Sequence, residues 1–304
     1  MNSDEEECSV PRKNIFQLVE ENYDVKSEIE KINELFSMKY YFAKDYLDGL
    51  SLEGVSFERI IEDYLFDNWK YRGTCISIEE YFSCANADID SLNTITEEEI
   101  INNLEVMENF VKLYFDNKNK LYREYQVSCY TTFKTVFCEL LNTLERKMGL
   151  VKRKYKDKVI LYPKNAPLEK VVDLCDDEDV QWELIRYVRE DLSLYEKRKA
   201  LACLATNLNI EDSDEKDEDI KKNIGQAKYI LNNLHIRHNN KTGKFESKAL
   251  KGLSETVAMS LCDMAYNVML IIMLLRDNEK YKPAYNEYRD KKRDEKAIKK
   301  AEEN

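Results

Sequence analysis

The chain of 304 residues contains only 7 glycines and 4 prolines. In average proteins these two residue types make up about 7% and 5% of all positions, so both are scarce here. Because glycine and proline form many of the tight turns, a chain with few of them has few turns and therefore long elements. Long elements favour helices over many short strands. We therefore predict an all-α protein.

The composition is that of a globular protein with a strongly charged surface, since apolar residues make up 43% of the chain and charged residues 35%. A chain of this length forms one large domain or two modest ones. Its net charge of −12 at pH 7 opposes broad, non-specific binding to a nucleic-acid backbone. Basic segments lie at 151–158 and 289–300, and a solvated run of charge is the simpler interpretation of both.

The first half of the chain has four stretches in which apolar residues recur at helical spacing, and each predicts an amphipathic helix. Thr96 and Glu99 have the spacing of a capping box, which predicts the start of the third helix. Glycines predict three of the helix ends. The expected helices cover residues 24–49, 57–73, 96–114 and 122–149.

The pattern changes after residue 149. The segment 158–163 is short, β-prone and ends in a proline, and 150–167 holds two of the four prolines. We expect a small β-hairpin or an ordered linker over 150–167. It would separate an N-terminal helical lobe at 1–149 from a C-terminal helical bundle at 168–304.

Helical patterns resume in the C-terminal lobe. A capping box, Ser193 with Glu196, predicts the start of one of these helices, and an acidic loop at 211–219 precedes another. The most apolar helix is expected at the centre of the lobe, and a charged tail follows it. The expected helices cover residues 179–190, 193–208, 220–234 and 250–275.

The stretch Val257–Leu275 is nearly long enough to span a bilayer. Asp263 and Asn267 interrupt it, however, and the centre of a bundle also requires a helix that is apolar all round. We interpret it as a buried core helix. The acidic N-terminus has no apolar stretch typical of a targeting signal. These features predict a cytoplasmic protein that does not bind a membrane.

Eight cysteines are spread along the chain, and no pair has the spacing of a zinc site. We expect reduced thiols that mostly pack in the core. The acidic cluster at 173–179 lacks the spacing and the glycine of a calcium loop, so a solvated helix start is the better interpretation. Nucleotide-binding, metalloprotease and serine-hydrolase motifs are absent from the sequence. We expect neither a metal nor a cofactor.

Both histidines of the chain, His235 and His238, lie in one short segment with Arg237 between them. A guanidinium group binds a phosphate with two hydrogen bonds, and an imidazole moves a proton near neutral pH. Asn239 or Asn240 is placed to orient that imidazole. The set suits RNA cleavage without a metal, in which a base activates the 2′-hydroxyl and the arginine stabilises charge on phosphorus. Alternatively, these residues only cap the end of the preceding helix.

A helix that ends in this segment, a short polar loop and then a long apolar helix resembles the C-terminal half of HEPN-type domains. The resemblance covers about residues 176–277 and is strongest to bacterial abortive-infection proteins, which act in defence against phage. It implies a HEPN-like helix bundle and a dimeric, metal-independent endoribonuclease or RNA binder. Arg237 would bind phosphate, with His238 as its polar companion. We expect four further RNA-binding residues nearby: Asn239, Asn240, Lys241 and Lys244.

The family pattern has a further histidine beyond this pair, where the present chain has residues 241–244 and no histidine. Either His238 or His235 takes the catalytic role, or the site binds RNA without cutting it. Two hypotheses follow. The first is an antiviral effector that cuts RNA and forms a homodimer through its C-terminal helices. The second is a non-catalytic interaction or regulatory protein of a phage-defence or phage system, whose N-terminal lobe binds a protein partner.

Overall fold

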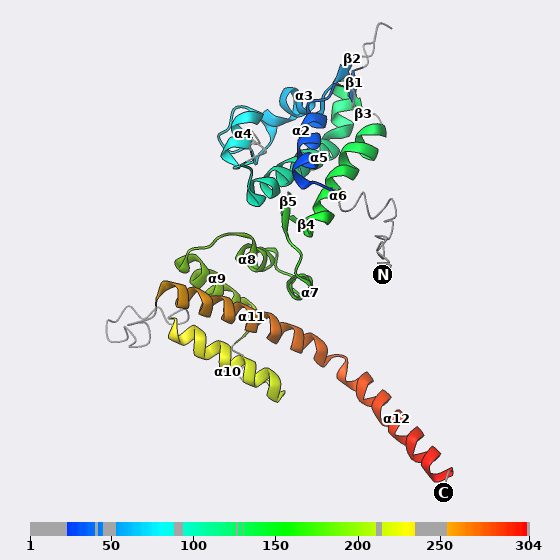
Figure 1. The fold of residues 1–304 in the computed structure, drawn as a ribbon, viewed down its shortest axis with the longest axis vertical. Coiled ribbons are helices and arrows are strands. Elements are labelled where there is room, and N and C mark those ends of the chain that lie inside the picture. Colours follow the sequence, from blue (N-terminus) through cyan, green and yellow to red (C-terminus); the bar gives the residue numbers. More distant parts are fainter. Residues whose placement is uncertain are drawn as a thin grey trace, which may run out of the picture. The chain divides into compact units, whose positions relative to one another are not determined.

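The computed structural model describes residues 23–39, 42–44, 53–87, 94–125, 127–129, 131–210, 215–234 and 254–302. This part of the chain is mostly helical, as predicted for an all-α protein. The chain divides into two compact units (Figure 1). Unit 1 comprises Met1–Lys154 with Lys158–Leu161, and unit 2 comprises Tyr155–Asp157 with Tyr162–Asn304.

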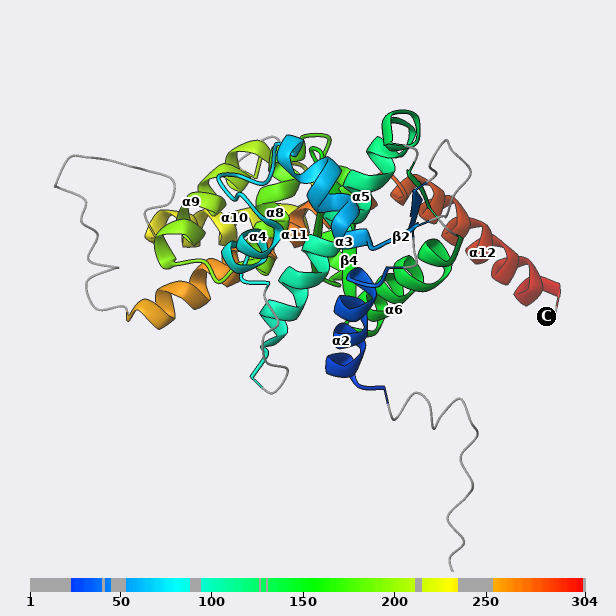
Figure 2. The same cartoon turned by 90° about the horizontal axis from the view of Figure 1, so that it is seen from above.

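Unit 1 combines α-helices with irregular helical turns. Two turns are π-helical, at Ile61–Leu65 and Phe133–Cys138, and a 3-10 turn lies at Phe66–Asn68. Helices α2 and α6 pack side by side (Figure 2). The α-helices are α2 (Val25–Phe36), α3 (Phe57–Ile60), α4 (Ile78–Cys84), α5 (Glu97–Tyr125) and α6 (Glu139–Lys147).

A small antiparallel sheet corrects the prediction of one helix over 24–49. Helix α2 ends at Phe36, and Phe42–Lys44 forms β1, the central strand between β2 (Glu53–Val55) and β3 (Val127–Cys129). The sequence around Phe42 is rich in aromatic residues, which favour strands. Phe42 is fully buried there, so tertiary packing decides its conformation.

Helix α5 runs without a break from Glu97 to Tyr125, where the sequence predicted two separate helices. No glycine or proline lies between the two predicted stretches, so nothing ends the helix there. The chain then enters β3 before the next helical turn, at the β-branched Val127, which favours a strand. Gly149 follows α6 with φ of +66°, which agrees with the predicted helix end.

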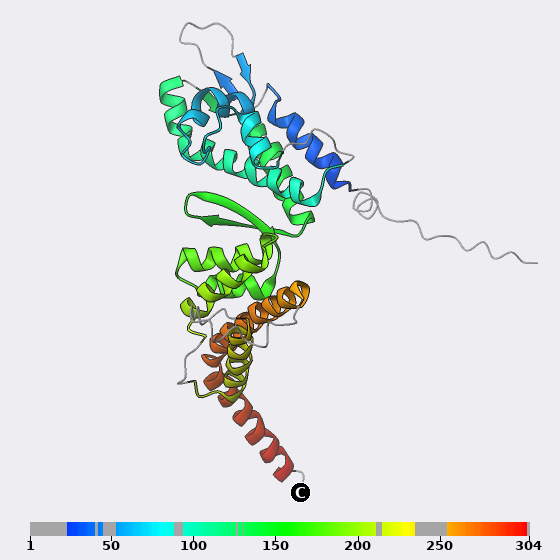
Figure 3. The same ribbon diagram turned by 90° about the vertical axis from the view of Figure 1, so that its left-hand side faces the viewer.

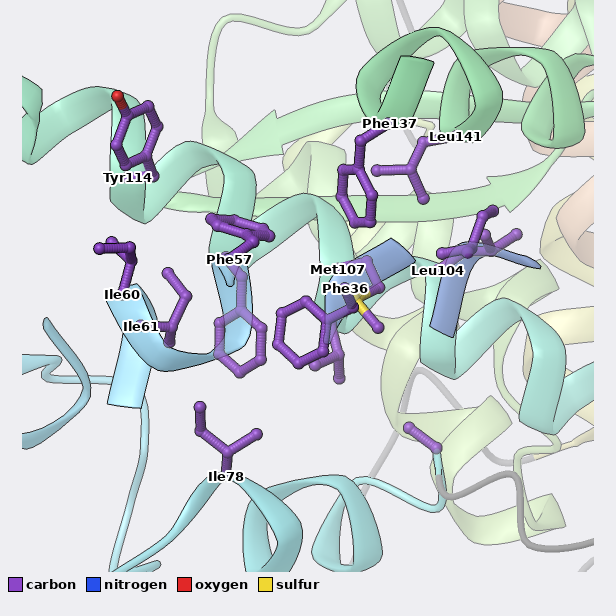
Figure 4. Close-up of a cluster of buried hydrophobic side chains, with 14 of the residues drawn as sticks. Phe36, Phe57, Ile60, Ile61, Ile78, Leu104, Met107, Tyr114, Phe137 and Leu141 are labelled. Carbon is purple, nitrogen blue, oxygen red and sulfur yellow. The ribbon is translucent and has the colours of Figure 1, made fainter. Parts of the chain in front are cut away.

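The core of unit 1 combines aliphatic side chains with a connected set of aromatic rings (Figure 4). Phe57 contacts Phe36 edge-to-face with ring centroids 5.5 Å apart, and it lies 4.7 Å from the ring of Phe133. Phe133 stacks on Phe137 at 5.4 Å. Such pairs contribute about 0.5–1.5 kcal/mol each beyond the area that they bury. These contacts join α2, α3 and the π-helical turn before α6 into one core.

A two-stranded hairpin, β4 (Leu150–Tyr155) with β5 (Lys158–Pro163), occupies the segment for which we expected a hairpin or a linker (Figure 3). Lys156 forms its turn with φ of +51°. Side chains of α5 hold β5. Asn109 accepts a hydrogen bond from Val159 N at 2.9 Å and donates one to Val159 O at 2.8 Å, and Glu105 accepts from Leu161 N at 2.7 Å.

Unit 2 is a helical bundle with α11 at its centre, as predicted, since α11 packs against α7, α9 and α10. Ser193 and Glu196 form the predicted capping box. Ser254 caps α11, which therefore begins later than the predicted residue 250. The helices are α7 (Ala166–Leu174), α8 (Glu178–Arg189), α9 (Leu194–Asn207), α10 (Glu218–Asn233), α11 (Glu255–Glu279) and α12 (Lys282–Glu302).

Within the described residues, α11 is the single helix that is long and apolar enough to cross a membrane. Of its most apolar stretch, 44% is buried inside the protein. Its contacts with three neighbouring helices place α11 at the centre of unit 2, as predicted. Its apolar stretch is less buried than expected for a helix that is enclosed all round.

Candidate functional site

All the predicted site residues lie in the segment that connects α10 to α11, outside the described residues. They are His235, Arg237, His238, Asn239, Asn240, Lys241 and Lys244. The structure therefore describes the two helix ends between which this segment runs. The geometry of those ends decides where the segment leaves and rejoins the bundle.

The end of α10 is well defined. Leu234 N donates to Ile230 O at 2.9 Å, and the side-chain amide of Asn233 donates to Tyr229 O at 2.9 Å. Leu234 itself is buried, with 1% of its surface exposed, so the helix is anchored up to its last turn. The candidate residues follow at once, and His235 is the next residue in the chain.

The start of α11 is equally fixed, because the Ser254 hydroxyl accepts a hydrogen bond from Val257 N at 3.3 Å. Helices α10 and α11 run antiparallel and pack together, so the end of one and the start of the other lie at the same end of the pair (Figure 1). Both helices carry buried apolar side chains. They are Ile220, Ile224, Ala227, Ile230 and Leu231 of α10 and Ala258, Cys262, Ala265, Tyr266, Val268, Met269, Leu270 and Ile272 of α11.

Each of the two helices has one exposed, largely apolar side chain near this end. Tyr229 is 72% exposed, one turn before the end of α10, and Val257 is 44% exposed, in the first turn of α11. An exposed tyrosine ring offers a flat face on which a nucleic-acid base can stack. Tyr229 was not among the residues predicted to bind RNA, although its place on α10, shortly before the histidine segment, was visible in the sequence.

Asp263, which interrupts the apolar sequence of α11, lies in a polar cluster between three helices of unit 2. Its carboxylate accepts from Tyr187 Oη of α8 at 3.1 Å and from Lys197 Nζ of α9 at 2.5 Å. The Tyr187 ring stacks on Tyr266 with centroids 4.2 Å apart, and Tyr266 Oη donates to Leu184 O at 2.7 Å. The cluster therefore fixes α8 and α9 against α11.

Burial raises the pKa of Tyr187, and the charge of Asp263 raises it further. Burial also raises the pKa of the neighbouring Cys262 thiol to about 11, with the charge of Asp263 as the next cause. Both groups are therefore protonated at neutral pH. A tyrosine that donates to a carboxylate and a thiol that stays neutral stabilise packing, and neither is activated for nucleophilic chemistry.

A second polar cluster lies in unit 1, where two buried carboxylates meet one lysine. Glu108 of α5 is 7% exposed and Glu145 of α6 is 5% exposed. Lys152 of β4 donates to Glu108 Oε1 at 2.7 Å and lies 3.2 Å from Glu145 Oε2. It also donates to Asn142 Oδ1 at 3.0 Å. Burial raises the pKa of Glu145 to about 8, and the adjacent Glu108 charge raises it further, against the opposing effect of Lys152.

This second cluster was not predicted, although the sequence carries a signal for it. In the sequence, Glu108 directly follows Met107 and Glu145 directly follows Leu144. Met107 and Leu144 are buried apolar residues of their helices. A carboxylate at such a position requires a partner. Lys152 belongs to the basic segment 151–158, which we had interpreted as solvated.

Among the described residues, no group of three or more histidine, cysteine, aspartate or glutamate side chains is arranged to hold a metal ion. Comparisons with protein-family models, with curated proteins and with solved structures gave no match.

Proposed function

We propose that this protein is a HEPN-like antiviral effector of the abortive-infection type that acts on RNA. The observation that supports the proposal is the antiparallel pair of α10 and α11, whose connecting segment carries Arg237 and both histidines. A rigid helix pair with a polar connection brings catalytic or binding groups to one end of a bundle. The proposal also rests on the resemblance stated above for residues 176–277.

In the proposed reaction Arg237 binds the scissile phosphate and stabilises the negative charge that develops on it. His238 or His235 removes the proton of the 2′-hydroxyl, which then attacks the phosphorus atom. Asn239 or Asn240 orients the imidazole, and Lys241 and Lys244 contact neighbouring phosphates. Cleavage of this kind needs no metal ion.

The proposal includes a homodimer formed through α11. Three exposed apolar side chains recur along that helix at seven-residue spacing: Val257 at 44%, Met264 at 42% and Ile271 at 44% exposure. Residues seven apart lie on one face of a helix, and such a row pairs with the same row of a second copy. A dimer of this kind would bring two connecting segments into one assembly.

The first experiment incubates the purified protein with total RNA and with tRNA in EDTA. Arg237→Ala and His238→Ala serve as site variants, and Lys228→Ala, earlier on α10, serves as a matched surface control. The proposal expects cleavage by the parent and the control, and none by either site variant. Intact RNA with every protein, each shown to be folded by circular dichroism, would reject the nuclease activity.

The second candidate is a non-catalytic interaction or regulatory protein. It is favoured by the absence of a histidine at 241–244, where the HEPN pattern has one. Gel-shift measurements with uncleaved RNA distinguish two versions of this second candidate, one that binds RNA and one that binds a protein. RNA binding that Arg237→Ala weakens would indicate an RNA-binding module, whereas the lack of binding would direct attention to a protein partner of the N-terminal lobe.

A further inference from the structure

Helix α12, the last helix of unit 2, lies in solvent along its first half. Every residue from Tyr281 to Lys292 is exposed, and no other described helix of unit 2 runs beside α12 (red in Figure 1). The exposed side chains include three tyrosines: Tyr281 at 55%, Tyr285 at 62% and Tyr288 at 61% exposure. The described part of unit 2 therefore leaves a group of aromatic rings uncovered, which is typical of a surface that binds another molecule.

The start of α12 is anchored in the bundle. Tyr285 N donates to Tyr281 O at 3.0 Å, which closes the first helical turn. Lys282 Nζ forms ion pairs with Glu279, at the end of α11, and with Asp217, the N-cap residue of α10. The three tyrosines therefore stand on a helix whose first turn is tied to two other helices of unit 2.

The tyrosines share one face of α12. They are four and three residues apart, a spacing that places side chains one above another on a helix. With a rise of about 1.5 Å per residue, their positions along the helix axis are about 6 Å and 4.5 Å apart. Neighbouring bases in one strand of a duplex are only about 3.4 Å apart. The wider spacing of the rings suits the bases of an extended single strand.

The same face has a row of basic residues. At about 100° per residue, Arg289 and Lys292 lie within about 40° of Tyr285 around the helix axis. An arc of about 140° contains only tyrosine, lysine and arginine positions between residues 281 and 300. The helix continues to Glu302, and its spacing places four further basic positions on this face: Arg293, Lys296, Lys299 and Lys300.

The acidic residues of α12 occupy other positions. Glu287, Asp290 and Asp294 lie on the opposite side of the helix, and Glu295 borders the basic face. Outside that face Lys291 pairs with Glu287 at 2.8 Å. We interpreted 289–300 as a solvated run of charge, but the charges of a solvated helix alternate in sign along its faces. Here they are separated, so a chain with a net charge of −12 has one face that is complementary to a polyanion.

We propose that the face of α12 from Tyr281 to Lys300 binds single-stranded nucleic acid. Bases stack on the three tyrosine rings, and the cations that follow them pair with phosphates. An anionic membrane is a poorer fit, because a helix in a membrane surface buries a broad apolar face, and this face has only tyrosines and cations. The residues of α12 have no role in the proposed function above, so the two proposals can fail separately.

The test measures the fluorescence anisotropy of two labelled oligonucleotides with the full-length protein. One is oligouridine with methylated 2′-hydroxyls and the other is oligodeoxythymidine, each of about 20 nucleotides, longer than the usual site of roughly 4–16 nucleotides. Neither has a free 2′-hydroxyl, so the proposed cleavage cannot destroy the probe. We expect the parent to bind at least one of them, and the stronger of the two shows which sugar is preferred.

Removal of two rings tests the stacking. Tyr285→Ala with Tyr288→Ala should weaken binding about tenfold or more, because each stacked base contributes to affinity. Tyr195→Ala removes a ring that is 75% exposed on α9 and should leave the affinity unchanged. Alanine favours helix, so α12 should keep its structure in the double variant, and circular dichroism checks this.

Two adjacent lysines test the face. Lys292→Gln removes a cation from it and should lower the slope of log affinity against log salt by about 0.7, the value for one phosphate of a single strand. Lys291→Gln removes a cation from outside it and should leave the slope nearly unchanged. Equal effects of the two variants would overturn the proposal. So would a parent that binds neither probe, a tyrosine double variant of full affinity, or tighter binding to vesicles of anionic phospholipid.

Discussion

Glu108 and Glu145 lie against each other in the interior of unit 1 and share one ammonium group, that of Lys152. Two ionised carboxylates with one cation would leave a net negative charge in a buried place, which is costly. A proton on Glu145 removes that charge. The cluster therefore holds β4 against α5 and α6 in a way that depends on pH.

The pKa of Glu145 is about 8 in the folded protein and near its ordinary value of 4.5 in the unfolded chain. The folded state binds the proton more tightly, so this contribution to stability is complete below pH 4.5 and is lost as pH rises through 8. We expect Glu145→Gln to raise the free energy of unfolding at pH 8 by about 1–3 kcal/mol. Urea denaturation at pH 5 and pH 8 measures the difference.

The matched control for that experiment is Glu139→Gln, which removes an exposed carboxylate from the same helix. This control variant should show the same pH dependence of the free energy of unfolding as the parent. An equal gain at pH 5 and pH 8 in Glu145→Gln would show that the ionisation of Glu145 does not control stability.

Removal of the shared cation should have the opposite effect. We expect Lys152→Met to lower the free energy of unfolding by about 2 kcal/mol, because the buried Glu108 then lacks its cation and Glu145 lacks a hydrogen-bond partner. Lys154→Met, on the same strand, should change it by less than about 0.5 kcal/mol. The double variant Lys152→Met with Glu145→Gln should recover part of the loss. Strictly additive effects would show that the two groups are not coupled.

For the polar cluster of unit 2 we predict a similar coupling between two substitutions. Asp263→Leu should cost about 1–3 kcal/mol of stability, because Lys197 and the Tyr187 hydroxyl lose their acceptor. Since the Lys197 side chain is only 13% exposed, Lys197→Met in the same protein should restore part of that loss. Thermal unfolding of the four proteins measures the coupling. A double variant that is no more stable than Asp263→Leu alone would argue against it.

If the protein forms the proposed dimer, a substitution at the dimer surface should change its mass in solution. Met264→Glu places a charge at the middle of the exposed row on α11 and should convert a dimer to a monomer in sedimentation velocity. Tyr195→Glu, at a residue of α9 that is 75% exposed, is the control and should leave the dimer intact. A parent protein that sediments as a monomer at high concentration would contradict the dimer.

Local sequence rules predicted the helices that carry strong end signals. The capping boxes at Thr96–Glu99 and Ser193–Glu196 both form, and α8 and α10 lie close to their predicted bounds. Helix α4 was missed even though Ser77 and Glu80 have the same spacing as those capping boxes. Its seven residues are too few to show a clear period.

The remaining differences arise from tertiary contacts or from the ambiguity of proline. Phe42 belongs to a strand because its ring fits among Phe57, Tyr114 and Phe133, a contact between distant parts of the chain. Pro167 was interpreted as part of a linker, yet it stands in the first turn of α7, where proline is well tolerated. The candidate residues from His235 to Lys244 lie outside the described part of the chain, so their roles stay predictions.

The contact between α5 and β5 has a consequence for how this protein avoids edge-to-edge aggregation of its strands. In a hairpin of two strands each strand has an outer edge, whose free N–H and C=O groups can pair with a strand of another molecule. Along β5, Asn109 meets both polar groups of Val159 and Glu105 meets the N–H of Leu161, as a neighbouring strand would. Helix α5 thus covers Val159 and Leu161 with side chains, and an incoming strand finds these three polar groups already paired.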